Sequence, residues 1–230
     1  MNASQYDKFP FHHLAVDCVI FGYENRKLKL LLSRRKIEPE KNKWSLQGGW
    51  LNPDETVEQA AARVLLNFTG LKDIYLEQVH VCSNPNRDPG GRVVSVVFYA
   101  LIRIDKYDKE LVSKHGAKWW SLRKKPNLIF DHDIMVEYAH DRLKLKASYE
   151  IIGKKLLPSK FTLLHLRNLY EAIFERIFDP GNFRKKILSL KVLERLNVKN
   201  TTDSKRGAYY YRFKEGKSLA FSDRFIKLNS

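Results

Sequence analysis

The sequence predicts a mixed α/β (α+β) sandwich followed by a C-terminal winged helix-turn-helix. Three observations predict it. Apolar strand-like runs alternate with two amphipathic helical patterns over residues 1–146. Helical patterns joined by a tight glycine-containing turn, and then two further strand-like runs, occupy residues 147–230. Lys and Arg are concentrated in this second part of a chain whose formal net charge is +16. We therefore expect two domains that meet near residue 146.

The first part has the residue patterns of a mixed sheet between helices. Its predicted elements are strands over residues 12–23, 27–35 and 44–47, a helix over 56–67, strands over 74–82, 93–104 and 119–122, and a helix over 131–146. Asp54 or Thr56 can cap the first helix, and Gly70 can end it. A charged loop containing Pro39 separates the second strand from the third.

The second part follows the pattern of a winged helix-turn-helix. Its predicted elements are helices over residues 147–157, 163–177 and 183–196, and wing strands over 193–198 and 208–213, the third helix overlapping the first wing strand. Thr162 and Asn182 are the predicted N-caps of the second and third helices. The third helix would read DNA bases.

Composition excludes several protein classes. No run approaches the roughly 18 apolar residues of a membrane span. The N-terminus lacks the charged and apolar regions of a secretion signal. Cys18 and Cys82 lie in apolar runs, so we expect two buried thiols rather than a disulfide or a metal site. We expect a cytoplasmic protein with no membrane partner.

The positive charge predicts a polyanionic partner. Double-stranded DNA fits the predicted helix-turn-helix best. The side chains expected to contact it are Lys160, Thr162, Arg184, Lys185, Ser189, Lys205 and Arg206. RNA binding stays open as an alternative, with Tyr209, Tyr210 and Tyr211 as its candidate stacking residues.

The stretch QGGWLNPDETVEQAAARVLLNFTGL, over residues 47–71, resembles a Nudix box, the loop–helix–loop cassette of pyrophosphate hydrolases. Gly49, Glu55, Arg63 and Gly70 fall at fixed positions of that box. A later Phe-Asp-His motif, residues 130–132, resembles the end of Nudix domains related to ADP-ribose hydrolases. The resemblance implies a Nudix-type fold over residues 9–146.

The glutamates that hold metal in a Nudix box are absent. Val64, Asn67 and Phe68 stand in their places, and Mg²⁺ requires a set of hard oxygen ligands. We therefore expect no catalytic residue, no metal and no cofactor, and we expect Arg63 to pair with Glu55 as a structural contact. A residual hydrolase stays open as an alternative.

A pocket without a metal suggests a sensor for a small molecule. Its predicted effector-binding residues are Trp44, Gln47, Gly48, Gly49, Trp50, Arg87, Asp88 and Asp131. Aromatic planes beside polar groups suit a sugar ring. Alternatively, Arg34, Arg35 and Lys43 could receive phosphates.

The whole chain resembles the Nudix-related transcriptional regulators, which join a degenerate Nudix domain to a winged helix. The resemblance covers residues 9–222 and implies a homodimer that binds a palindromic operator under the control of a small effector. It favours the sugar-responsive branch, with L-arabinose as the effector in control of sugar catabolism. Control of NAD metabolism by ADP-ribose is the alternative.

Overall fold

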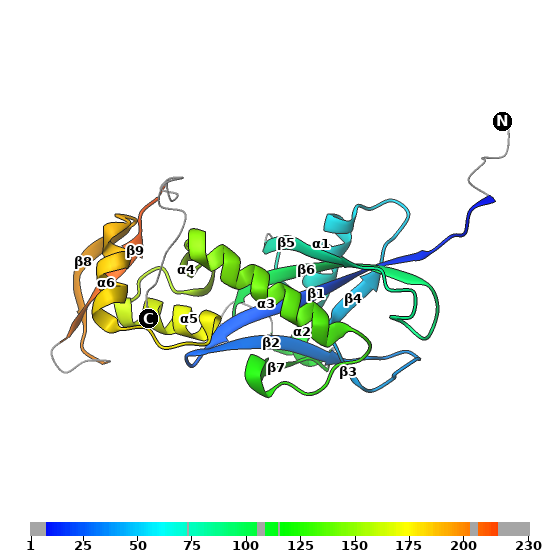
Figure 1. Ribbon diagram of the computed structural model, residues 1–230. Helices are drawn as coiled ribbons and strands as arrows, with labels where there is room; N and C mark the ends of the chain where they lie inside the picture. The colour runs from blue at the N-terminus through cyan, green and yellow to red at the C-terminus, as the bar shows by residue number, and fades with distance from the viewer. Residues whose placement is uncertain (1–7, 73, 105–108, 115, 203–206, 216–230) are drawn as a thin grey trace.

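The computed structural model describes residues 8–72, 74–104, 109–114, 116–202 and 207–215. It consists of a sheet sandwiched between helices and a smaller helical domain with a two-stranded wing (Figure 1). Within the described residues, no helix combines the length and apolar character that a membrane crossing requires.

A seven-stranded mixed sheet forms the first domain. Its strands are β1 (His13–Glu24), β2 (Lys27–Arg34), β3 (Trp44–Ser45), β4 (Gln47–Trp50), β5 (Tyr75–Cys82), β6 (Val93–Arg103) and β7 (Lys118–Ser121). The main order is β3-β2-β1-β6-β5, with β4 on β1 and β7 on β2. Among the strand pairs of the described residues, only β1–β6 is parallel. The mixed sheet predicted from the sequence is confirmed.

Helices cover both faces of the sheet, and alternate residues of β1 contribute to the two cores that result. Val16 and Ile20 pack in the core beneath α1 (Val57–Thr69). Val19 and Phe21 pack in the core beneath α3 (His132–Tyr149). Burial on both faces explains why β1 is a nearly continuous apolar run rather than an alternating one.

The first helix, α1, was predicted over residues 56–67 and runs from Val57 to Thr69. Thr56, one of the two predicted caps, caps it, and Gly70 ends it as predicted. Thr56 Oγ1 accepts the Gln59 N–H, and the Gln59 side chain accepts the Thr56 N–H, which completes a capping box. Gly70 ends the helix in the left-handed region at φ 71°. The structure also contains a short helix that the sequence did not predict, α2 (Lys109–Lys114).

The second domain is a winged helix (Figure 1). It comprises α4 (Gly153–Leu156), α5 (Leu163–Phe174), α6 (Pro180–Ser189), β8 (Leu193–Asn200) and β9 (Ala208–Phe213). The predicted helix over residues 147–157 is wrong, because α3 continues to Tyr149 and α4 is a single turn. Thr162 caps α5 as predicted. The predicted end of α5 at residue 177 is wrong, because Glu175 already adopts the left-handed conformation.

The bounds predicted for α6 are also wrong. Asp179, not Asn182, is its N-cap: Asp179 Oδ1 accepts the Asn182 N–H at 2.7 Å, and Pro180 supplies the preset first-turn φ. The helix ends at Ser189, because residues 193–196 belong to the β8–β9 ladder. The wing itself is present as predicted.

One apolar core runs through both domains. It contains Leu143 and Ala147 of α3 together with Leu166, Leu169 and Tyr170 of α5. The predicted join at residue 146 lies inside α3. Because α3 contributes to the sheet core and to the winged helix core, the two domains are packed together along this helix.

We predict that Leu143→Ala lowers the free energy of unfolding by about 2–5 kcal/mol, since it leaves a cavity where the side chain is 0% exposed. Leu145→Ala removes the same atoms from the same helix at a position 51% exposed, and should change stability by about 0.5 kcal/mol or less. Urea unfolding of both variants checks this. Equal losses would contradict the shared core.

Candidate functional site

A cleft of about 370 Å³ opens beside the ends of β2 and β4, the last turn of α1 and the start of α3. Its walls are formed by Ala15, Asp17, Ser33, Arg34, Arg35, Lys36, Ile37, Ser45, Leu46, Gly48, Gly49, Trp50, Asn67, Phe68, Arg87, Asp88, Val93, Phe130 and His132. This volume lies in the range of small-molecule sites. Cations, aromatic rings and buried polar groups all reach the cleft, so it can bind a polar ligand that also carries an apolar group.

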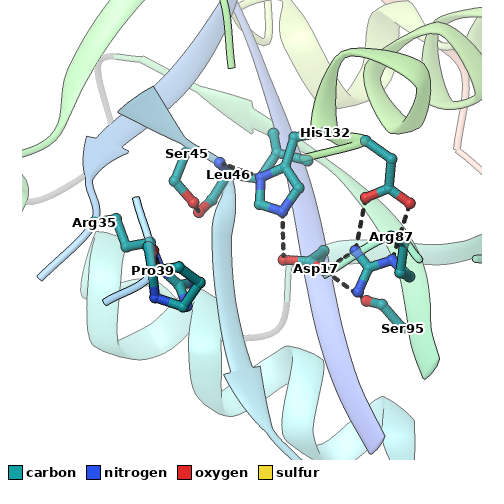
Figure 2. A network of polar contacts seen from close by, with 9 residues as sticks. Asp17, Arg35, Pro39, Ser45, Leu46, Arg87, Ser95 and His132 are labelled. Carbon is teal, nitrogen blue, oxygen red and sulfur yellow. Dashed lines mark hydrogen bonds and ion pairs between the residues drawn. The ribbon is translucent and has the colours of Figure 1, made fainter. Parts of the chain in front are cut away.

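A buried ionic network forms the floor of the cleft (Figure 2). Arg87, whose side chain is 3% exposed, donates through Nε and Nη2 to the two carboxylate oxygens of Asp131 at 2.9 and 2.8 Å. Arg87 Nη2 also lies 3.7 Å from Asp17 Oδ2, which accepts the Ser95 hydroxyl at 2.6 Å. A buried guanidinium needs such partners, because an unpaired buried charge is strongly destabilising. The network therefore fixes the β5–β6 loop against β1 and α3.

His132 stands at the opposite side of Asp17 (Figure 2). Its Nδ1 accepts the Leu46 N–H at 3.2 Å, so the proton of the neutral ring lies on Nε2, 3.8 Å from Asp17 Oδ1. Burial lowers the pKa of His132, and Asp17 opposes that effect. The ring is therefore neutral at pH 7.

The two glycines of the box are required by close packing. A Cβ on Gly48 would lie 2.4 Å from Asp17 Oδ1, which leaves no room for a side chain. A Cβ on Gly49 would lie 3.1 Å from Val64 Cγ2. The glycine pair thus lets β4 approach both the buried carboxylate and α1.

The cationic side of the cleft comes from the end of β2. Arg34 Nη1 donates to the Asn42 carbonyl at 2.6 Å, and its guanidinium lies 4.1 Å from the Trp44 ring centre. Arg35 Nε donates to the Pro39 carbonyl at 2.6 Å, and neither of its Nη groups makes a hydrogen bond to the described residues. Arg35 is therefore held in place with donors left for an anion.

Five of the residues predicted to bind an effector line the cleft: Gly48, Gly49, Trp50, Arg87 and Asp88. The other three do not line it. Trp44 lies against Arg34 and Trp120, Asp131 is bound to Arg87, and Gln47 is 0% exposed. Of the alternative phosphate ligands, Arg34 and Arg35 line the cleft, whereas Lys43 pairs with Glu40 outside it.

His132, at the start of the last predicted helix of the Nudix domain, lines the cleft as the sequence indicated, whereas Asp17 and Phe130 line it without having been singled out. The Phe-Asp-His motif was the available signal for Phe130. Asp17 offered only a lone carboxylate inside an apolar run, which is unusual in a buried strand.

The metal positions of the box cannot hold Mg²⁺. Val64 is buried, and Asn67 and Phe68 line the cleft where carboxylates would be needed. The predicted Arg63–Glu55 pair is confirmed: Arg63 Nε donates to Glu55 at 2.9 Å, and this contact lowers the Glu55 pKa to about 2. No group of three or more acidic, His or Cys side chains in the described part of the chain is arranged to bind a metal.

The exposed face of α6 carries three of the predicted DNA-binding residues. Arg184, Lys185 and Ser189 are exposed, while Phe183 and Ile187 are buried against the domain. This arrangement leaves a polar, basic helix face free for a major groove.

The remaining predicted contacts lie elsewhere. Lys160 is exposed, with its Nζ 5.5 Å from the Tyr210 ring centre. Thr162 is 1% exposed and its hydroxyl accepts the His165 N–H, so this side chain caps α5 and has no surface for a phosphate. Lys205 and Arg206 lie outside the described residues.

The wing carries basic residues that the sequence reading missed. The half-exposed Tyr209 ring lies 4.6 Å from the Arg195 guanidinium and 5.0 Å from Lys199 Nζ. The spacing of Arg195 and Lys199 along β8 was the available signal, since alternate residues of a strand share a face.

Together, the fold and the cleft define a Nudix-type ligand-binding domain joined to a winged helix DNA-binding domain. The NUDIX domain family model matches residues 11–135, and that of the NrtR DNA-binding winged helix domain matches residues 153–213. The chain belongs to the NrtR-like family, whose members combine these two domains.

Individual relatives agree with this assignment. The ADPR responsive transcriptional repressor NtrR of Acinetobacter baylyi is 34% identical over 216 residues, covering 91% of this chain and 86% of the relative. The crystal structure of Shewanella oneidensis NrtR with a 27mer DNA has a TM-score of 0.77 and 32% identity, covering 87% of this chain and 93% of that one. The NUDIX domain of the same Shewanella protein, solved with ADP ribose, has a TM-score of 0.54 and 34% identity, covering 62% and 94%.

The neutral, buried His132 predicts a pH effect on stability. Its folded-state pKa lies below the unfolded value, so the unfolded state binds more protons as the pH falls below about 6.5. The free energy of unfolding should then fall by up to about 1.4 kcal/mol per pH unit from this group. We predict a shallower decline between pH 7 and 5.5 for His132→Asn, and parallel curves above pH 7.5. Equal slopes at acidic pH would contradict the assignment.

Proposed function

We propose that this protein is a transcriptional regulator whose Nudix domain binds ADP-ribose and whose winged helix binds duplex DNA. The observation that carries the proposal is the cleft itself. It combines a cationic edge with aromatic walls and lacks the carboxylates for metal-dependent cleavage. Named relatives that respond to ADP-ribose, or were solved with it, support the same ligand.

The chemistry of the cleft favours ADP-ribose over a free sugar. The pyrophosphate of ADP-ribose is anionic and suits Arg34, Arg35 and Lys36. Trp50 and Phe130 offer rings for the base or a ribose. L-Arabinose, which the sequence reading preferred, is uncharged and would leave those cations without a partner, so ADP-ribose replaces it here.

The same residues argue against hydrolysis. Val64, Asn67 and Phe68 occupy the ligand positions of the box, and Glu55 is held by Arg63. A cleft of this composition binds a pyrophosphate without activating water on a metal. The relative from Acinetobacter baylyi is named as a repressor, which agrees with a regulatory role.

The proposal extends to a homodimer on a palindromic operator. A two-fold dimer would present two α6 helices to successive major grooves, so the operator would carry two related half-sites. The family resemblance supports this arrangement.

Arg35→Gln should weaken ADP-ribose binding roughly tenfold to a hundredfold, because it removes a charge-assisted contact worth about 1.5–3 kcal/mol. Isothermal titration calorimetry of the full chain measures this. Lys41→Gln, an exposed residue of the same loop that does not line the cleft, is the matched control. Tight binding of L-arabinose with none of ADP-ribose would refute the proposed effector.

Arg184→Ala combined with Lys185→Ala should weaken operator binding about tenfold or more. The slope of log affinity against log salt concentration should fall by about one to two, because up to two phosphate contacts are lost. Gel shifts at two salt concentrations measure both effects. Lys41→Ala with Lys72→Ala removes the same charge from the Nudix domain as a control. If both double variants lost affinity equally, α6 would not be the DNA-reading helix.

A further inference from the structure

The C-terminal end of α5 is completed by side chains from the other domain. A helix leaves its last carbonyl groups without partners inside the helix. In α5 the chain leaves the helix at Glu175, which adopts φ 56° and ψ 29°, a left-handed conformation that glycine or asparagine usually fills. The turn to α6 starts at this residue, so its geometry sets where the DNA-reading helix lies.

Two Nudix-domain residues hold this end of α5. Arg123 follows β7; its Nη2 donates to the Glu175 carbonyl at 3.1 Å and its Nε to Glu175 Oε1 at 2.9 Å. His140 of α3 places Nε2 2.8 Å from the Ile173 carbonyl. Because a carbonyl can only accept, His140 Nε2 is the donor. Cationic and N–H groups at a helix C-terminus complement its dipole.

We propose that Arg123 and His140 are positioning residues through which the Nudix domain sets the orientation of α6, by supplying the C-terminal cap of α5. The contacts join the short 3-10 helix after β7 (Leu122–Lys124) and helix α3 of one domain to the turn of the helix-turn-helix in the other. The assignment adds to the proposed function a means of regulation, and it rests on that function.

The two positioning residues sit on elements that also form the effector cleft. His140 lies two turns along α3 from His132, which lines the cleft at the start of that helix. Arg123 follows β7, which pairs with β2 through Lys29 and Ser121, and β2 ends at the cleft with Arg34. In Figure 1, α3 runs along the sheet toward α5. A ligand that shifts the start of α3 and the end of β2 therefore acts on both contacts.

The rest of the turn is held from within the winged helix. The Phe178 N–H donates to Glu171 Oε1 at 3.1 Å, and Asp179 caps α6. Those contacts join α5 to α6 and involve no residue of the Nudix domain. The Arg123 and His140 contacts differ in kind, since they join the end of α5 to the Nudix domain.

Arg123 is suited to positioning more than to stability. Its side chain is 67% exposed, and exposed ion pairs contribute little to folding. His140 is buried and packs against Phe21 of β1 with ring centres 6.3 Å apart. A variant of Arg123 should consequently fold normally while losing the orientation of the turn.

The test measures the operator dissociation constant of the full chain with and without saturating ADP-ribose, and takes the ratio of the two as the coupling factor. Arg123→Gln should move this factor toward one by about threefold or more, while ADP-ribose affinity stays within about twofold of wild type. Arg123→Lys, which keeps a cation for the Glu175 carboxylate, should recover most of the coupling. Lys118→Gln removes one exposed positive charge from β7, the strand that precedes Arg123, and should behave as wild type.

A second variant isolates the other contact. His140→Phe keeps a ring against Phe21 and removes the N–H that donates to the Ile173 carbonyl. Like Arg123→Gln, it should move the coupling factor toward one. Thermal unfolding confirms that both variants are folded before the ratio is taken.

The outcomes separate the two proposals. If wild type shows no ADP-ribose binding or no change in DNA affinity, the proposed function fails. If wild type shows coupling and Arg123→Gln keeps it in full, the positioning role is overturned and the proposed function stands. Loss of coupling in Arg123→Gln without recovery in Arg123→Lys would also overturn it, because the cation would then not be the active feature.

Discussion

The buried pairing of Arg87 with Asp131 and Asp17 is the interaction on which the cleft depends. It joins the β5–β6 loop, the start of α3 and the centre of β1, three segments distant in sequence. Removing one partner would leave an unpaired buried charge, at a cost of about 3–5 kcal/mol. Gly48 leaves the space that Asp17 fills, and His132 completes the surroundings of that carboxylate. This network therefore fixes the start of α3.

The chain keeps the supporting parts of a Nudix box and has lost its metal ligands. Gly49 and the Arg63–Glu55 pair hold the loop against α1. Phe68 and Asn67 turn the metal site into one side of a binding surface. Binding without turnover suits a regulator, because a ligand that stays intact can shift the population of DNA-binding states for as long as it is present. The winged helix would convert that shift into a change in DNA binding.

Local patterns predicted much of the fold, since strands, caps and the box are encoded within a few residues of one another. The predicted Thr56 cap, the Gly70 stop and the Arg63–Glu55 pair all formed. Long-range pairings were not predictable: the sequence indicated one pocket for Arg87 and Asp131, but not that they bind each other across 44 residues. Gln47 was misplaced because its side chain is fully buried, which the local sequence does not indicate. The third helix was overextended because residues 193–196 join the wing by pairing with β9.

The central claim is that the cleft holds an anionic nucleotide sugar without cutting it. Phosphorus-31 NMR of ADP-ribose mixed with the full chain and Mg²⁺ tests this most directly. We predict pyrophosphate resonances that shift or broaden on binding and keep their total intensity over hours. Growth of monophosphate signals at the expense of the pyrophosphate would contradict it, as would resonances that stay unchanged when the protein is added.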